Sequence, residues 1–257
     1  MNARSKAAKR AWETRRKKKK RLSRRAKKAW KTRRLDWKKL RRGILLVECI
    51  PEDYGDCSEG KMLKELFRII KFQMTDNNES VEVDSKETDS PSELVEILRN
   101  AEKPCIHISC HGNHDKRRRR SRRTFLDLDE GKLFADEICS SGDEQLLIWF
   151  ERDGENKEIP QLVFLSACKT ALASDLCERF MQAGVRYVIG PKKSTSFHEA
   201  ALFSTVFYTF LYVERWNPYL AFKKIKNAFP KLARNWWFYD AYKHYFRYYD
   251  PNGTGLL

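Results

Sequence analysis

The sequence lacks the apolar patterns that direct a chain into or across a membrane. It has no run of about 18 apolar residues, which a transmembrane helix needs, and no apolar signal-peptide core follows Met1. Paired cysteine spacing is missing too: the seven cysteines are an odd, scattered set, which argues against a disulfide framework. We therefore expect a soluble, cytoplasmic protein without a membrane span, whose thiols are reduced.

Positive charge is abundant but unevenly placed. The chain of 257 residues carries a formal net charge of +17. Residues 1–42 hold 22 Lys or Arg and 2 Asp or Glu, a net +20, which leaves −3 for residues 43–257. We expect a basic arm (1–42) followed by one globular domain (43–257). A second basic run, KRRRRSRR at 116–123, fits a solvated loop, a phosphate-binding patch or a processing loop.

The basic arm contains an internal repeat. The pattern S-x-x-A-K-x-A-W-x-T-R-R begins at Ser5 and again at Ser23, a period of 18 residues, which is about five turns of an α-helix. One face of a continuous helix would therefore carry both tryptophans and both arginine pairs: Trp12, Arg15, Arg16, Trp30, Arg33 and Arg34. We expect this face to bind DNA or RNA, with arginines on phosphates and indoles on sugars or bases. The alternatives are an acidic protein or membrane surface, or a disordered arm without a fixed partner.

From Gly43 onward, short apolar runs alternate with amphipathic stretches. The apolar runs predict buried strands over 43–49, 105–110, 162–165 and 185–190. The amphipathic stretches predict helices over 58–72, 90–100, 171–184, 197–213 and 217–229. Residues 79–84 fit a short alternating strand, and residues 245–253 fit a last strand or a packed loop. Ser90, Pro91 and Glu93 have the spacing of a capping box. This alternation predicts an α/β fold around a mostly parallel sheet.

Two of the predicted strands run into reactive side chains. CIHISCHG (105–112) leads to His111, and LVFLSACKT (162–170) leads to Cys168. If both strands reach one edge of a parallel sheet, they deliver a cysteine nucleophile and its proton-transfer partner. We also expect Cys168 at or near a helix N-terminus, where the macrodipole favours the thiolate. The alternative is a buried structural cysteine.

HISCHG, LSACKTA, AGVRYVIGP and YYDPNG together resemble the CHAT-type peptidase domains of the caspase-like (clan CD) fold. The resemblance runs from about Gly43 to the C-terminus and leaves the basic arm outside. It implies a three-layer α/β/α sandwich and a cysteine endopeptidase that cleaves a protein or peptide. It also implies that Cys168 is the nucleophile, that His111 is the general base and acid, and that the backbone N–H groups of Gly112 and Cys168 form the oxyanion hole. The alternative is a catalytically weak or inactive caspase-like module that binds nucleic acid or a partner.

One loop departs from the family pattern. The family often carries a Trp and an Asp after its last core strand, whereas this chain reads GPKKSTSFHEA, with Lys192, Lys193 and Phe197. A cationic loop disfavours a basic substrate and favours an acidic one. The chain also has no tetratricopeptide-like repeat, which often serves as the sensor of CHAT domains. A sensor or activator would then be a separate chain or the arm itself.

Five metal-capable residues cluster on the first of these strands: Cys105, His107, Cys110, His111 and His114. Successive side chains of a strand point to opposite faces, so these ligands do not converge. Zinc sites usually take paired ligands from separated segments. We expect no metal and no other cofactor.

Overall fold

A computed structural model of the chain describes residues 40–49, 58–74, 81–114, 124–138, 160–172, 175–183 and 185–241. All of them belong to one compact unit, Trp37–Ala241. The six residues predicted to bind nucleic acid, the basic run 116–123 and the aromatic segment 245–253 lie outside these ranges. The predictions about them remain predictions.

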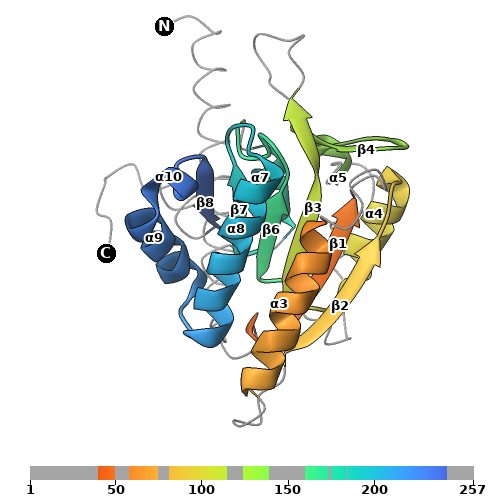
Figure 1. Ribbon diagram of the computed structural model, residues 1–257. Helices are drawn as coiled ribbons and strands as arrows, with labels where there is room; N and C mark the ends of the chain where they lie inside the picture. Colours follow the sequence, from red (N-terminus) through yellow and green to blue (C-terminus); the bar gives the residue numbers. More distant parts are fainter. Residues whose placement is uncertain are drawn as a thin grey trace, which may run out of the picture. The chain divides into compact units, whose positions relative to one another are not determined.

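A mixed sheet forms the centre of this unit, with β1, β3, β6 and β7 in its interior (Figure 1). Its main path has the order β2-β1-β3-β6-β7-β8. The strands are β1 (Gly43–Cys49), β2 (Glu82–Glu87), β3 (Cys105–His114), β6 (Leu162–Ser166), β7 (Tyr187–Pro191) and β8 (Trp236–Asp240). Neighbours pair in parallel except β8, which is antiparallel to β7. The mostly parallel sheet predicted from the sequence is confirmed.

Helices cover both faces of the sheet. They are α3 (Glu59–Met74), α4 (Pro91–Arg99), α5 (Ala135–Ile138), α7 (Asp175–Gln182), α8 (Phe197–Tyr208) with a π-helical turn (Thr209–Val213), α9 (Pro218–Ala228) and α10 (Pro230–Ala233). Helix α3 connects β1 to β2, and α4 returns the chain across β1 to β3. Because such crossovers are right-handed, these two helices lie on opposite faces. The three layers predicted from the family resemblance are present.

The core explains why the central strands read as continuous apolar runs. Every residue of β1, β6 and β7 is buried, as expected for strands covered on both faces. On one face α3 and α8 lie side by side (Figure 1), and the rings of Phe67 and Tyr208 approach to 5.4 Å between centroids. Phe203 of α8 stacks on Trp236 of β8 at 4.2 Å. Within the described residues no helix is long and apolar enough to span a bilayer.

Strand β3 is longer than predicted. It pairs in parallel with β1 as far as Cys110, and from His111 to His114 it pairs antiparallel with a neighbouring hairpin. That hairpin consists of β4 (Thr124–Leu128) and β5 (Gly131–Phe134). In Figure 1 the end of β3 accordingly extends beyond β1 toward β4. His111 therefore marks the point where the chain leaves the parallel sheet and enters a β-ribbon.

The prediction of a capping box at the start of α4 is wrong, because its hydrogen bonds do not form. Ser90 is the N-cap residue and Pro91 opens the helix, but the Ser90 side chain makes no capping hydrogen bond. The carboxylate of Glu93 instead accepts a bond of 2.6 Å from the hydroxyl of Thr88. A competing donor just upstream thus engages the glutamate that the pattern assigned to Ser90. A true capping box occurs at α8, between Ser196 and Glu199.

Candidate active site

His111 and Cys168 lie at the same edge of the sheet. Strands β3 and β6 are adjacent and parallel, with Ser109 opposite Ser166. His111 and Cys168 each follow two residues later. The side chain of His111 is exposed, and that of Cys168 is partly exposed. The juxtaposition that the two sequence patterns predicted is therefore present in the backbone.

Gly112 brings the two segments into direct contact. A Cβ atom added to Gly112 would overlap the carbonyl oxygen of Cys168, and it would lie 3.0 Å from the carbonyl carbon of Ala167 and from the amide nitrogen of Cys168. These are backbone atoms, which cannot move aside as the end of a flexible side chain can. Only glycine lets the chain after His111 pass this close to Cys168.

Cys168 opens a turn rather than a helix, so the prediction of a helix N-terminus at the cysteine is wrong. The helix begins only at Asp175, whose carboxylate accepts a bond of 2.9 Å from the Thr124 N–H and ties the start of α7 to β4. Before that, the N–H of Ala171 donates to the carbonyl of Pro191 at 2.9 Å. Since this donor bonds to the last residue of β7, the segment folds onto the end of that strand. The helix-dipole argument for the thiolate does not apply here.

Lys169 holds this turn in an uncommon conformation. Its φ of 61° lies in the left-handed region, which costs a residue with a side chain roughly 1–3 kcal/mol. Its N–H donates to the carbonyl of Lys193 at 3.3 Å, and its Nζ donates to Oδ1 of Asn113 at 3.1 Å. Asn113 follows His111 by two residues. The strained residue thus connects the cysteine turn to both neighbouring segments of the site.

The sulfur of Cys168 makes two hydrogen bonds to the backbone of one residue, Thr195. Sγ donates to the carbonyl oxygen of Thr195, and the Thr195 N–H donates to Sγ, both at 3.4 Å. Thr195 lies between β7 and α8, in the loop that departs from the family pattern. Sequence reasoning missed it because both contacts use backbone atoms, so no residue type signals them.

The cationic character predicted for that loop is divided between its lysines. The Nζ of Lys192 lies 3.3 Å from the ring centroid of Trp237, a cation–π contact. Lys193 is exposed.

The register also places Asp127 of β4 directly opposite His111, so both side chains project from one face of the ribbon. The sequence had shown no such carboxylate beside the histidine.

Cys168 differs from the other described cysteines. All five described cysteines are free, and Cys49, Cys105, Cys110 and Cys177 are buried whereas Cys168 is not. Burial raises the pKa of Cys105 to about 12 and raises that of Cys177 further. The thiols of Cys105 and Cys177 are therefore protonated at neutral pH, and burial shields all four cysteines, so chemistry at a described cysteine falls to Cys168.

The metal-capable residues of β3 do not gather. His107 is buried, and its Nδ1 lies 2.8 Å from the hydroxyl of Tyr208 on α8. Cys110 instead donates its S–H to the carbonyl of Asp127 on β4, at 3.4 Å. In the part of the chain that the structure describes, no three His, Cys, Asp or Glu side chains are placed to hold a metal ion.

Comparison with known proteins adds one finding. The sequence model of the CHAT domain matches residues 57–228, about two-thirds of the chain and including both His111 and Cys168. No curated protein matches the sequence.

Proposed function

Because the chain belongs to the CHAT domain family, a family of caspase-like peptidases, we propose that it is a cysteine endopeptidase with Cys168 as nucleophile and His111 as general base and acid. The observation that carries the proposal is the backbone contact between Gly112 and Cys168. That contact places the residue after His111 against the cysteine, at one edge of the sheet. The partial exposure of Cys168 supports the same role, because a substrate carbonyl must reach the sulfur.

The proposed reaction divides the chemistry between these residues. His111 takes the thiol proton, and Sγ of Cys168 attacks the scissile carbonyl carbon, whose electron pair moves to the oxygen. The N–H groups of Gly112 and Cys168 are the proposed donors to this oxyanion. Collapse expels the amine, which receives the proton from His111, and leaves a thioester. Water, deprotonated by His111, then hydrolyses the thioester and restores the thiol.

Thr195 supports the first step. In the thiol form Sγ donates to the Thr195 carbonyl and accepts from the Thr195 N–H. Loss of the proton removes the first bond and leaves the second, which becomes a charge-assisted bond to the thiolate. The loop therefore supplies a donor for the charge that develops on sulfur. Lys169, next to the cysteine, and the exposed Lys193 support an acidic rather than a basic substrate.

We further propose that the arm, residues 1–42, binds DNA or RNA and links the peptidase to nucleic acid, with a separate sensor or activator chain. The basis is the sequence repeat with its tryptophans and arginine pairs. The second candidate function is a weak or inactive module that acts by binding. The two lysines that replace the family's usual loop pattern favour that alternative.

A thiol-directed peptide electrophile tests the enzyme. The wild-type protein should be labelled at Cys168, and both Cys168→Ala and His111→Ala should lose that label. A comparison of cleavage sites in a proteome treated with wild type or Cys168→Ala then identifies the substrate. Equal labelling of wild type and His111→Ala, with no cleavage site that depends on Cys168, would establish the binding module instead.

A further inference from the structure

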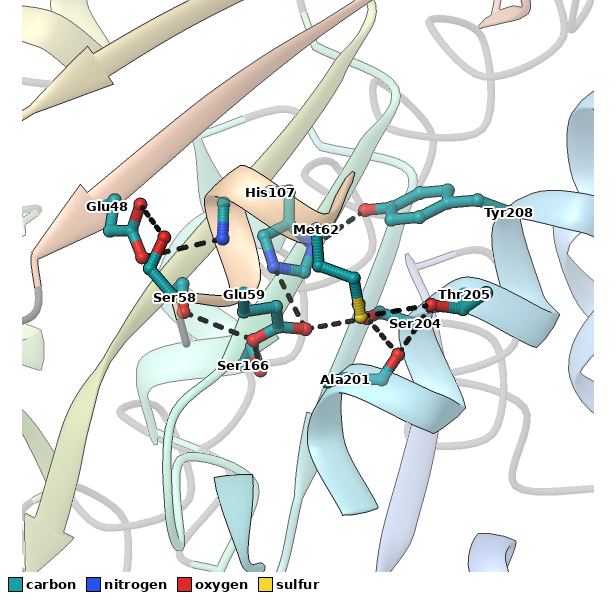
Figure 2. Close-up of polar contacts among 12 residues, drawn as sticks. Glu48, Ser58, Glu59, Met62, His107, Ser166, Ala201, Ser204, Thr205 and Tyr208 are labelled. Atoms are coloured by element: carbon teal, nitrogen blue, oxygen red, sulfur yellow. Dashed lines mark hydrogen bonds and ion pairs between the residues drawn. The ribbon is translucent and has the colours of Figure 1, made fainter. Parts of the chain in front are cut away.

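A buried carboxylate lies beneath the strand ends that carry the proposed dyad. Glu59 is the first residue of α3, and its side chain is 1 % exposed. Its Oε2 accepts a hydrogen bond of 3.1 Å from the hydroxyl of Ser109 on β3 and another from the hydroxyl of Ser166 on β6. Figure 2 shows the Glu59 carboxyl group lying between Ser166 and Ser204. A single oxygen atom of Glu59 therefore accepts hydrogen bonds from two adjacent strands.

The two serines occupy matched positions. Ser109 and Ser166 are partners in the register of β3 and β6. Ser109 precedes His111 by two residues, and Ser166 precedes Cys168 by two. Glu59 thus accepts its two strand bonds at the last paired residues of β3 and β6, just before the site. Sliding or separation of the strands at this level would change the distance between the imidazole and the sulfur.

The second carboxylate oxygen fixes Glu59 itself. Oε1 accepts a bond of 2.6 Å from Ser204 of α8 and lies 3.4 Å from Nε2 of His107. Burial opposes ionisation of Glu59, but the charge of His107 and the donors Ser166 and Ser204 outweigh it and lower the pKa of Glu59. The ionised carboxylate has no proton to donate, so every hydroxyl around it donates. The Glu59 carboxylate of α3 thus contacts residues of β3, β6 and α8 together.

Stability alone gives a weak reason for this arrangement. Replacing a buried ion pair by apolar residues often leaves stability unchanged or higher. Ser109 and Ser166 are only 1 % and 7 % exposed, and without Glu59 their hydroxyls would lose a buried acceptor. What the carboxylate provides is a defined geometry between two strand ends.

We propose that Glu59 is a positioning residue, whose carboxylate fixes the ends of β3 and β6 and thereby sets the distance between His111 and Cys168. The inference rests on the proposed function, since it concerns the same dyad. Glu59 does not touch the reacting atoms. We expect its replacement to weaken the interaction between the His111 imidazole and the Cys168 thiol.

Glu48 offers a matched control. It is also a buried glutamate, 8 % exposed, and although it belongs to β1, its carboxylate lies at the start of α3. Its carboxylate accepts from the Ser58 hydroxyl at 3.0 Å and from the Gly60 N–H at 3.4 Å (Figure 2). Its described bonds therefore go to the helix start, not to the strand-end serines. A general loss of packing or of a buried charge should affect both glutamate variants alike.

The test measures how fast iodoacetamide alkylates Cys168 of the full chain between about pH 5 and 9, the range in which an imidazole and a thiol titrate. Mass spectrometry of the peptide that contains Cys168 gives the rate at this residue alone. In the wild type, pairing with His111 should keep the thiol reactive at low pH, and His111→Ala should lose this low-pH reactivity. Glu59→Gln should lower it by about ten- to a hundredfold, as expected for misplaced reacting groups. Glu48→Gln should match the wild type.

The outcomes separate the two proposals. Equal profiles for Glu59→Gln, Glu48→Gln and wild type would overturn the positioning role while leaving the dyad in place. A His111→Ala profile equal to wild type would overturn the dyad, and the positioning role with it. If Glu59→Gln does not fold, the double variant Ser109→Ala/Ser166→Ala decides, because it removes the two strand bonds and keeps the carboxylate. An unchanged profile in that variant would refute the inference.

Discussion

The backbone of Gly112 lies against the carbonyl group of Cys168, so closely that no side chain fits between them. The contact joins residues that are 56 positions apart in the chain. It occurs where β3 leaves the parallel sheet and where the turn after β6 begins. Each segment limits where the other can go, and both carry a proposed catalytic group.

Gly112→Ala should therefore damage the site more than the fold. The added methyl group meets backbone, and overpacking of this kind costs about 1–3 kcal/mol. We expect a folded protein with a lower melting temperature and a loss of Cys168 labelling by the peptide electrophile. Gly43→Ala is the control, because the nearest atom to its added methyl group is Cδ of the Lys103 side chain, at 2.9 Å, and the nearest backbone atom, the Glu82 carbonyl oxygen, is at 3.2 Å. Retention of full labelling by Gly112→Ala would show that the close approach is dispensable.

Substitution of Lys169 should separate backbone strain from side-chain bonding. Lys169→Ala loses the bond to Asn113 and keeps the left-handed φ, whereas Lys169→Gly loses the same bond and relieves the strain. We expect the glycine variant to be more stable than the alanine variant by about 1 kcal/mol. Urea unfolding of the two variants gives the difference. A more stable alanine variant would mean that the turn does not keep this conformation.

Glu59 should make stability depend on acid pH. Its pKa in the folded protein lies below the ordinary value of 4.5, although burial opposes this, because His107 and the surrounding donors favour the charged form. The unfolded chain then binds more protons than the folded one, so this stabilisation is complete above pH 4.5 and is lost as pH falls toward the folded pKa. The free energy of unfolding of Glu59→Gln should fall less steeply below pH 4.5 than that of the wild type. Parallel curves would show that folding does not lower the pKa of Glu59.

Iodoacetamide should discriminate among the described cysteines of the native protein. Cys168 is partly exposed, whereas the other four are buried. Peptide mapping after brief treatment near neutral pH should find the adduct at Cys168 and not at Cys49, Cys105, Cys110 or Cys177. Denaturation before labelling is the control and should expose all five. Equal native labelling of the buried cysteines would contradict the described core.

Removal of the arm should abolish nucleic-acid binding without unfolding the domain. The deletion should cover residues 1–36, because Leu40 is fully buried in the core and must remain. We expect at least about a tenfold loss of affinity for DNA or RNA at low salt and a shallower dependence on salt. A melting temperature equal to that of the full chain serves as the control. Unchanged binding would assign the interaction to another segment, of which the run at 116–123 is the most basic.

The fold was readable from the sequence wherever burial alone decides the structure. The apolar runs at 43–49 and 162–165 became central strands because strands covered on both faces show no alternation. The length of β3 escaped prediction because its last residues, HGNH, pair with the hairpin although they carry no apolar signal. The start of α7 escaped because tertiary bonds to Pro191 and Thr124 override the helical pattern from Ala171.

The candidate site was predictable in its residue types and not in its supports. His111 and Cys168 follow from strands that end at one sheet edge, and the glycine after the histidine follows from the need for close approach. Thr195 contacts the sulfur through backbone atoms alone. Glu59 precedes its two serine partners by 50 and 107 residues. Neither spacing nor residue type indicates such long-range contacts, which depend on how α3 lies across the sheet.

The change of partner along β3 gives the two proposed catalytic residues different supports. His111 lies where β3 begins to pair with the hairpin of β4 and β5, and Cys168 lies in a turn that is hydrogen-bonded to the loop after β7. A ligand bound to the hairpin of β4 and β5 would therefore act on His111 through β3, and on Cys168 through the contacts that Gly112 and Asn113 make with the cysteine turn. The relative position of the two proposed catalytic groups would then respond to a ligand that contacts neither of them.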